Sequence, residues 1–361
     1  MPKPYSFLVG LFLTTIAAPA VAQTPQEQAY TKGMEAIKLM DNGNLAQSIV
    51  LLEEARRLDP KDFNYPYELG YALYMQKEYG QAIKMLAPLL THKDASDKVF
   101  QLLGNSYDMD GDAKKAVATY ESGLKQFPAS GSLYLELGNM KLGQKQYTQA
   151  LEYYEKGIEV APAFPSNYFR AAKIYLSSTS EMWGLLYGEV FMNLERNSPR
   201  TAEMSKLLYD TYKSEITFPN DSATAISLAP SLVVSVADVK HKKFKMPYSA
   251  SYETCMGVAV GGHRTINLTT LDAIRSSFVV NYYSMKLDEK YPSNILVDYQ
   301  QQIAQAGYAE AYNHWLLMMG DEDGFTKWLS INKIRFDDFA AWFNKHPLVL
   351  DDKHKLLRSQ F

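Results

Sequence analysis

The stretch that decides the fold is residues 97–164, which divide into two lines of equal length: DKVFQLLGNSYDMDGDAKKAVATYESGLKQFPAS (97–130) and GSLYLELGNMKLGQKQYTQALEYYEKGIEVAPAF (131–164). Placed one above the other, the two lines agree at a fixed step of 34 residues. The matching pairs are Gly104 and Gly138, Ala116 and Ala150, Tyr120 and Tyr154, and Pro128 and Pro162. A fixed period of this length indicates a repeat architecture.

The same columns continue on both sides of this stretch. Small residues recur at Gly70, Gly104, Gly138 and Ala172, and again at Ser48, Ala82, Ala116, Ala150 and Gly184. Small residues in these columns would let two antiparallel helices of a unit cross closely, with bulky columns beside them. Glycine near the turn permits backbone conformations that other residues avoid, and proline ends the second helix. A single unit cannot bury its apolar face alone, so stability requires stacking.

These residues resemble the signature of the tetratricopeptide repeat family. The match is Phe100-x-x-Leu103-Gly104-x-x-Tyr107, then Ala116, Tyr120 and Pro128, and the next line repeats it nearly position for position. The resemblance implies an all-α solenoid of helical hairpins. Its units lie near 29–62, 63–96, 97–130 and 131–164, with a degenerate unit and capping helix at 165–216, so that the array occupies 23–216.

The resemblance also implies where a ligand would lie, namely a groove lined by the first helix of each unit. The groove-facing positions are Asn64, Tyr67, Tyr71, Tyr74, Lys98, Gln101, Asn105, Asp108, Ser132, Leu135, Asn139 and Leu142. The three tyrosines form an aromatic stripe at helical spacing, which is also a common packing pattern. Asn105 and Asn139 are equivalent in neighbouring units and could bond the backbone of a peptide. Gln101 and Glu136 argue against a clamp for a peptide's terminal carboxylate.

The second half loses the period. Ala223 to Val239 is rich in apolar and β-branched residues with a break at Pro230, which predicts a linker or one or two short strands over residues 217–243. Residues 244–361 predict a small, mainly helical domain, with helices at 295–306, 309–319, 325–330 and 337–344 and a capping box at Thr269 and Asp272. Three of the four tryptophans lie there, and we expect them to build a core rather than a cofactor site.

The N-terminus has the features of a signal peptide at residues 1–22. Lys3 precedes an apolar run from Phe7 to Ala18, and Ala20-Val21-Ala22 matches the small-x-small cleavage pattern. The sequence therefore predicts export, with periplasm and secretion both open, and no transmembrane segment in the mature chain. Cys255 is the only cysteine, so no internal disulfide can form, and we expect this thiol to be buried.

Composition and motifs give little support for chemistry. The net charge is −3, without the basic excess of a nucleic-acid binder, and Lys240, Lys242, Lys243 and Lys245 read as a solvated loop. Asp108-x-Asp110-Gly111-Asp112 lacks the later glutamate of a calcium loop and lies where the repeat needs a turn. His241, Cys255 and His263 lack zinc spacing. His314 beside Trp315 is the most enzyme-like cluster. We therefore expect no catalytic residue, metal or cofactor.

Three functions remain open from the sequence. The first is an exported scaffold that holds a protein or peptide partner in a cell-envelope complex. The second is an enzyme or carbohydrate-binding domain in residues 244–361, with the repeats as an accessory. The third is a structural protein that self-associates. Repeat folds serve many functions, so the site has to decide among these.

Overall fold

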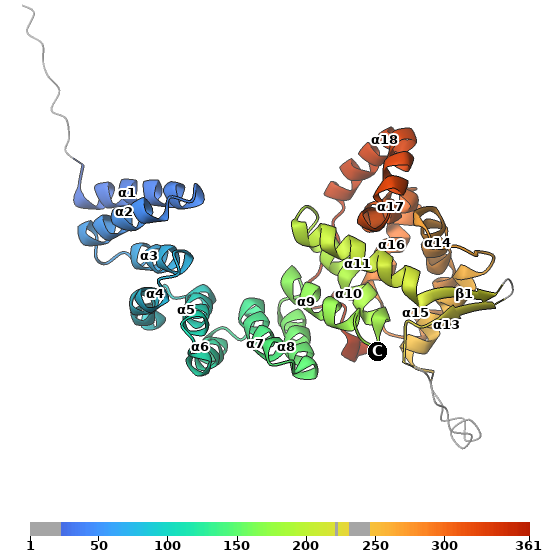
Figure 1. Cartoon of the computed structure of the whole chain (residues 1–361), viewed down its shortest axis with the longest axis horizontal. Helices are drawn as coiled ribbons and strands as arrows, with labels where there is room; N and C mark the ends of the chain where they lie inside the picture. Colours follow the sequence, from blue (N-terminus) through green and yellow to red (C-terminus); the bar gives the residue numbers. More distant parts are fainter. Residues whose placement is uncertain (1–22, 221–222, 231–245) are drawn as a thin grey trace, which may run out of the picture. The chain divides into compact units, whose positions relative to one another are not determined.

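The computed structural model describes residues 23–220, 223–230 and 246–361 and divides into two compact units, one ending at Asp94 and one from Ala95 to Phe361 (Figure 1). The predicted signal peptide, the lysine cluster and His241 lie outside the described residues. The sequence-based division into 23–216, 217–243 and 244–361 stays a prediction. The all-α fold class is confirmed, since helices dominate and one two-stranded sheet accompanies them.

The first unit contains two helical hairpins. Their elements are α1 (Pro25–Asp41), α2 (Leu45–Leu58), α3 (Asn64–Met75), α4 (Tyr79–Leu86) and the short 3-10 helix η1 (Ala87–Thr91). Thr24 caps α1 through a capping box with Glu27, so the free amides of the first turn have partners. Ala29, Ala55 and Tyr65 form a small buried cluster between the hairpins.

The second unit begins with three further hairpins in register with the period. Their elements are α5 (Asp97–Met109), α6 (Ala113–Gln126), α7 (Gly131–Gly143), α8 (Tyr147–Val160), α9 (Pro165–Tyr175) and α10 (Glu181–Leu194). Each first helix packs against its own second helix, and α5, α7 and α9 are also neighbours. These three helices therefore form one continuous surface, which we call the first-helix face.

The small-residue columns have the role that the sequence predicts. A Cβ on Gly104 would overlap the ring of Tyr120, and a Cβ on Gly138 would overlap Tyr154. Each tyrosine lies on the second helix of its hairpin, and its ring packs against the first helix at the glycine. Both tyrosines are almost fully buried. The absence of a side chain at the glycine is thus what brings the two helices close enough to pack.

The turns inside the hairpins follow the period as well. Gly43 and Gly111 have φ of 79° and 91°, and Lys77 and Lys145, at the equivalent positions, have φ of 65° and 59°. The Asp-rich stretch around Gly111 is therefore a turn. Lysine in a left-handed conformation is strained, because its Cβ approaches the following carbonyl. Among these four turns, the two that carry lysine therefore have a residue that is strained in this backbone conformation.

The rest of the second unit packs onto the last hairpin. Its elements are α11 (Pro199–Glu215), β1 (Ile216–Asn220), β2 (Ala223–Ile226), α13 (Tyr248–Val260), α14 (Leu268–Ser284), α15 (Leu287–Lys290), α16 (Ile295–Gln305), α17 (Ala309–Leu317), η2 (Met318–Gly320), α18 (Glu322–Lys345) and η3 (Arg358–Gln360). The strands pair antiparallel, with Ile216 opposite Ile226. One buried apolar cluster runs from Ala150 to Leu357, so these helices share a core with the repeats.

Two local predictions need correction. The cap of α14 is Asn267 with Thr270 rather than Thr269 with Asp272, because the chain enters the helix two residues earlier than the pattern suggested. The predicted helices at 325–330 and 337–344 belong to one element, α18, which kinks at Asn332 (φ −110°, ψ 19°). The side chain of Asn332 donates to the carbonyl of Trp328, which satisfies a backbone acceptor next to the kink.

A buried polar network joins the last repeat to the C-terminal helices. Glu189 on α10 accepts from Arg275 Nη2 of α14 at 2.8 Å, and its side chain is 4% exposed. Gln300 Nε2 of α16 (2.6 Å) and the Tyr312 hydroxyl of α17 (2.8 Å) donate to the same Glu189 oxygen. Arg275 also donates to Tyr212 of α11. Buried charges are tolerated when they are paired and hydrogen-bonded in this way.

Candidate functional site

The predicted aromatic stripe lies on α3 in the first unit. Tyr67 stacks on Phe63 with ring centres 6.1 Å apart, and Tyr74 contacts Tyr79 at 5.6 Å. Tyr71 is 38% exposed, and Asn64 is exposed at the start of the helix. Two of the three rings thus make packing contacts inside their own unit, and Tyr71 is the most available for a ligand.

The remaining predicted residues lie on α5 and α7, in the first-helix face of the second unit. Glu136 accepts from both Gln101 Nε2 (2.8 Å) and Asn139 Nδ2 (3.0 Å), so the three side chains form one chain of hydrogen bonds across the two helices. Ser132 donates to Asp97 at 3.3 Å. Lys98 and Asp108 are exposed at the two ends of α5. The structure thereby brings six predicted residues onto one polar surface: Lys98, Gln101, Asn105, Asp108, Ser132 and Asn139.

Asn105 and Asn139 are held in the same way in successive repeats. The Tyr120 hydroxyl donates to Asn105 Oδ1 at 2.6 Å, and the Tyr154 hydroxyl donates to Asn139 Oδ1 at 3.0 Å. Burial raises the pKa of Tyr154 well above its usual value, so this hydroxyl keeps its proton at neutral pH. With the amide oxygen fixed, each asparagine directs its NH₂ group as a donor. In Asn105 this donor has no partner among the described residues.

Beyond Asn139 the first-helix face opens into a cavity of about 540 Å³. Its lining comes from the end of α7, the start of α8, the second half of α9 and the turn after α9: Leu142, Tyr147, Arg170, Lys173, Ile174, Ser177 and Ser178. Tyr147 is 51% exposed at its rim. The mixture of aliphatic, aromatic and cationic side chains suits a ligand group that is partly apolar and partly anionic.

The two cations of this cavity differ in their pairing. Lys173 Nζ lies 2.5 Å from Glu203 of α11, so its charge is already matched. Arg170 makes no hydrogen bond or ion pair within the described ranges 23–220, 223–230 and 246–361. An unpaired guanidinium beside an apolar hollow is a donor for a carboxylate, because its planar fork matches two carboxylate oxygens.

Sequence reasoning missed most of this cavity. The groove positions expected from the repeat register include Leu142 but not Tyr147, Arg170 or Lys173. The signal was present, since Lys173 stands 34 residues after Asn139 and 68 after Asn105. Extending the groove positions into the degenerate unit would have found Lys173. Arg170 lies one position off that register, so its place required the structure.

His314, the most enzyme-like residue of the sequence, is part of the core. It is 2% exposed, its Nδ1 lies 2.8 Å from the carbonyl of Glu310, and its ring stacks on Trp328 at 4.1 Å. Trp315 packs on Phe343 in the same core. These contacts give both residues a structural role. Within the described part of the chain, no cluster of three or more His, Cys, Asp or Glu side chains is arranged to hold a metal ion.

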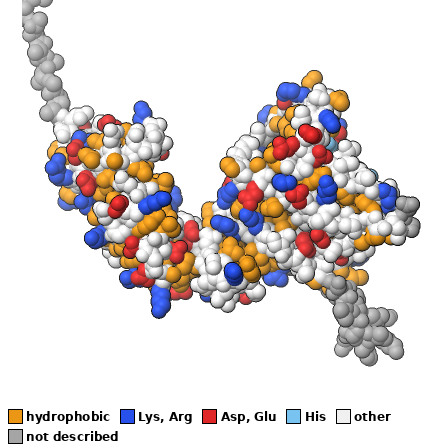
Figure 2. All heavy atoms as spheres, in the orientation of Figure 1, with side chains coloured by type: hydrophobic (Ala, Val, Ile, Leu, Met, Phe, Trp, Pro, Cys, Tyr) orange, Lys and Arg blue, Asp and Glu red, His pale blue; other side chains and the backbone are white. Residues whose placement is uncertain are grey.

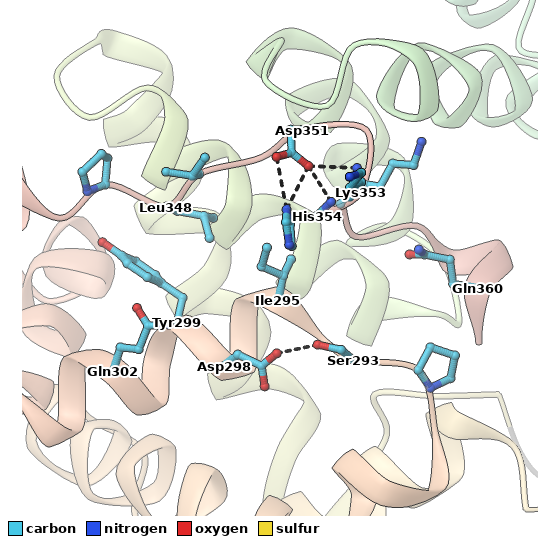
Figure 3. Close-up of a pocket in the computed structure, with 14 residues that line it drawn as sticks. Ser293, Ile295, Asp298, Tyr299, Gln302, Leu348, Asp351, Lys353, His354 and Gln360 are labelled. Atoms are coloured by element: carbon cyan, nitrogen blue, oxygen red, sulfur yellow. Dashed lines mark hydrogen bonds and ion pairs between the residues drawn. The ribbon is translucent and has the colours of Figure 1, made fainter.

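A further cavity of about 640 Å³ lies between α16 and the C-terminal segment (Figure 3). Asp351 accepts from the ring of His354 at 2.9 Å, and this contact lowers the pKa of Asp351 to about 2. On the facing wall Ser293 donates to Asp298 at 2.5 Å. Carboxylates and cations are mixed around this cavity, so its lining selects no single class of ligand.

Surface charge is mixed in the same manner on a larger scale. Figure 2 shows acidic and basic side chains interspersed, with hydrophobic side chains between them, on the face in view. None of the helices within the described ranges is long and apolar enough to span a membrane.

Comparison with known families agrees with the repeat geometry. A family model described as tetratricopeptide repeat matches residues 39–105, and a second model of the same description matches residues 102–168. Residues 39–168 are tetratricopeptide repeats. No curated protein matches it.

Several solved structures are similar to about half of this chain. MamA is 18% identical over 47% of this chain and 93% of its own, with a TM-score of 0.37. PilF of Pseudomonas aeruginosa is 18% identical, with 53% and 86% coverage and a TM-score of 0.44. PilW, described as a widely conserved type IV pilus biogenesis factor, is 17% identical, with 52% and 85% coverage and a TM-score of 0.42.

Proposed function

We propose that the protein is an exported, non-enzymatic scaffold that binds a peptide segment of a protein partner on the first-helix face of α5, α7 and α9. The observation that carries this proposal is the repeated asparagine donor beside the Arg170 cavity. At the same repeat position Asn105 presents an amide donor, and Asn139 keeps a second N–H beside the one that it donates to Glu136, so both can donate to the backbone of an extended peptide. The cavity then takes one anchoring side chain.

The lining of the cavity defines the anchor. Leu142, Tyr147 and Ile174 supply apolar surface, and Arg170 supplies an unpaired positive charge. The preferred partner segment therefore carries a bulky aliphatic or aromatic residue next to an aspartate or glutamate. Burying the apolar group gives most of the affinity, and the guanidinium selects the acidic neighbour.

A peptide-display selection against the full chain tests this proposal. Selected peptides should share an acidic residue beside a bulky apolar one, and binding should weaken about tenfold or more in Arg170→Gln, since a charged hydrogen bond is lost. Lys206→Gln is the matched control, because Lys206 is an exposed cation of α11 that does not line the cavity. Equal binding by the wild type and Arg170→Gln would show that the peptide does not bind in this cavity.

The exported location rests on the Ala20-Val21-Ala22 pattern at the predicted cleavage site. Expression with residues 1–22 included should yield a mature chain that starts at Gln23 and is recovered outside the cytoplasm. Replacing Ala20 and Ala22 by leucine should block cleavage. A cytoplasmic protein that retains residues 1–22 would contradict export while leaving the peptide-binding proposal untouched.

A further inference from the structure

The segment Lys355–Phe361 lies against the second helices of the last two hairpins. Lys355 Nζ donates to the carbonyl of Glu159 on α8 at 2.8 Å. Arg358 donates to both carboxylate oxygens of Glu155, through Nε at 3.0 Å and Nη2 at 3.2 Å. The backbone amide of Arg358 donates to the Tyr187 hydroxyl of α10 at 2.9 Å.

Neighbouring side chains hold the Glu155 carboxylate in the position where it binds Arg358. Its Oε1 atom also accepts from the hydroxyls of Tyr175 (2.8 Å) and Tyr187 (3.2 Å), which fix the carboxylate in place. The Glu155 side chain is 15% exposed, so little water competes for it. A fixed and partly desolvated carboxylate gives a fork-shaped guanidinium a defined binding position.

Aromatic rings hold the other end of the segment. Phe361 contacts Tyr248 with ring centres 4.3 Å apart and Trp183 at 5.6 Å. A cavity of about 410 Å³ remains beside Phe361 and Arg358, and Tyr175, Trp183 and Tyr248 also line it. The segment therefore fills only part of an aromatic pocket that has room for a larger ring.

We propose that this surface, which we call the tail cleft, is a second peptide-binding site that recognises an arginine three residues before an aromatic residue. In the structure the chain's own Arg358 and Phe361 occupy it as an internal ligand. A partner segment of the same chemistry binds by displacing residues 355–361. The tail cleft lies on α8, α10 and α13 and is distinct from the first-helix face, so it goes beyond the function proposed above.

The contacts of the segment permit this exchange. Arg358, Ser359 and Gln360 are exposed, and the Arg358 side chain is 48% exposed despite its ion pair. Leu356 and Leu357 of the same segment are buried in the core, so displacement also has to replace these two apolar side chains. Apart from the short η3 turn, residues 351–361 have no helix or strand that would have to unfold first. Local opening of such a segment is far cheaper than global unfolding. A competitor of the same sequence, KHKLLRSQF, recovers the ion pair and the ring contacts and buries its own two leucines where Leu356 and Leu357 lay.

The test uses the full chain and a labelled peptide, KHKLLRSQF, which has the sequence of residues 353–361. Binding is followed by fluorescence anisotropy. Arg358→Glu with Phe361→Ala weakens the internal ligand, so this variant should bind the peptide about tenfold or more tightly than the wild type. Adding Glu155→Arg should abolish binding, and a peptide with glutamate in place of its arginine should restore it. A scrambled peptide is the control.

Hydrogen exchange on the wild type tests the proposal without any variant, so it remains decisive if a variant does not fold. The amide of Arg358 should exchange through local opening, faster than the amides of α10, and excess peptide should change its rate without changing those of α10. Exchange of Arg358 only together with α10 would overturn the proposal, as would equal peptide binding by the wild type and the tail-weakened variant. Arg170→Gln should leave all these results unchanged.

Discussion

The ion pair between Glu189 and Arg275 gives the sharpest test of how the second unit is held together. The two side chains are 4% and 6% exposed and carry opposite charges in the middle of a shared core. Removing one partner leaves the other charge buried without its counter-charge. In Arg275→Met, Glu189 keeps only the donors from Gln300 and Tyr312. The expected loss of unfolding free energy is about 3–5 kcal/mol.

This magnitude is a large fraction of a typical stability of about 5–15 kcal/mol. The double variant Arg275→Met/Glu189→Gln should recover part of the loss, because it replaces a buried charge by a neutral group of similar shape. Lys206→Ala is the control. It breaks an exposed i,i+4 pair with Asp210 on α11 and should change stability by less than about 0.5 kcal/mol.

Urea unfolding monitored by tryptophan fluorescence is the appropriate assay. All four tryptophans (Trp183, Trp315, Trp328 and Trp342) lie in the second unit, so the signal reports that unit and not the first. The m-value must stay constant for a shift of the midpoint to be read as a change in stability. A loss below about 1 kcal/mol in Arg275→Met would refute the reasoning, because it would show that the pair is not desolvated in solution.

Further predictions follow from the repeats and the thiol. Lys145→Gly and Lys77→Gly should each raise stability by about 1 kcal/mol, because both lysines have positive φ, whereas Gly111→Ala should lower it; thermal melts compare the three. Gly104→Ala should destabilise by about 1–3 kcal/mol through overlap with Tyr120, while Gly143→Ala, which meets open space, should not. Burial raises the pKa of Cys255 to about 12, so the thiol should resist a disulfide reagent at pH 8 until urea unfolds the chain. Because the folded pKa is raised, the stabilising contribution of this neutral thiol is full below the unfolded pKa and declines at higher pH.

The repeat half was predictable because its constraints recur at a fixed step. Gly104 and Gly138 are required by the rings of Tyr120 and Tyr154, and a requirement that repeats every 34 residues is visible in the sequence alone. The face of α5 and α7 followed from the same register. The hydrogen bonds from these tyrosines to Asn105 and Asn139 could not be predicted in this way, because a column of aromatic residues does not show which acceptor each hydroxyl contacts.

The C-terminal half could not be predicted in the same way, because its contacts join distant residues and do not recur at a fixed step. Glu189 and Arg275 are 86 residues apart and meet only after α11, the strands and α13 have been placed between them. No local pattern marks either residue as a partner of the other. The cap at Asn267 was missed because Thr269 and Asp272 offered an equally good local motif, and tertiary packing decided between the two.

The fifth repeat shows how a solenoid ends. In α6 and α8 one face is buried, but in α10 every residue from Met182 to Asn193 is buried. Phe191 stands where three of the four earlier repeats have a small residue, and it packs on Phe169 of α9 with ring centres 4.9 Å apart. A large side chain is tolerated there because α10 is covered by α11 and the C-terminal helices instead of another hairpin. The departure from the repeat pattern at this position therefore marks where the array ends. Glu189, two residues before Phe191, belongs to the polar network that holds the C-terminal helices against α10.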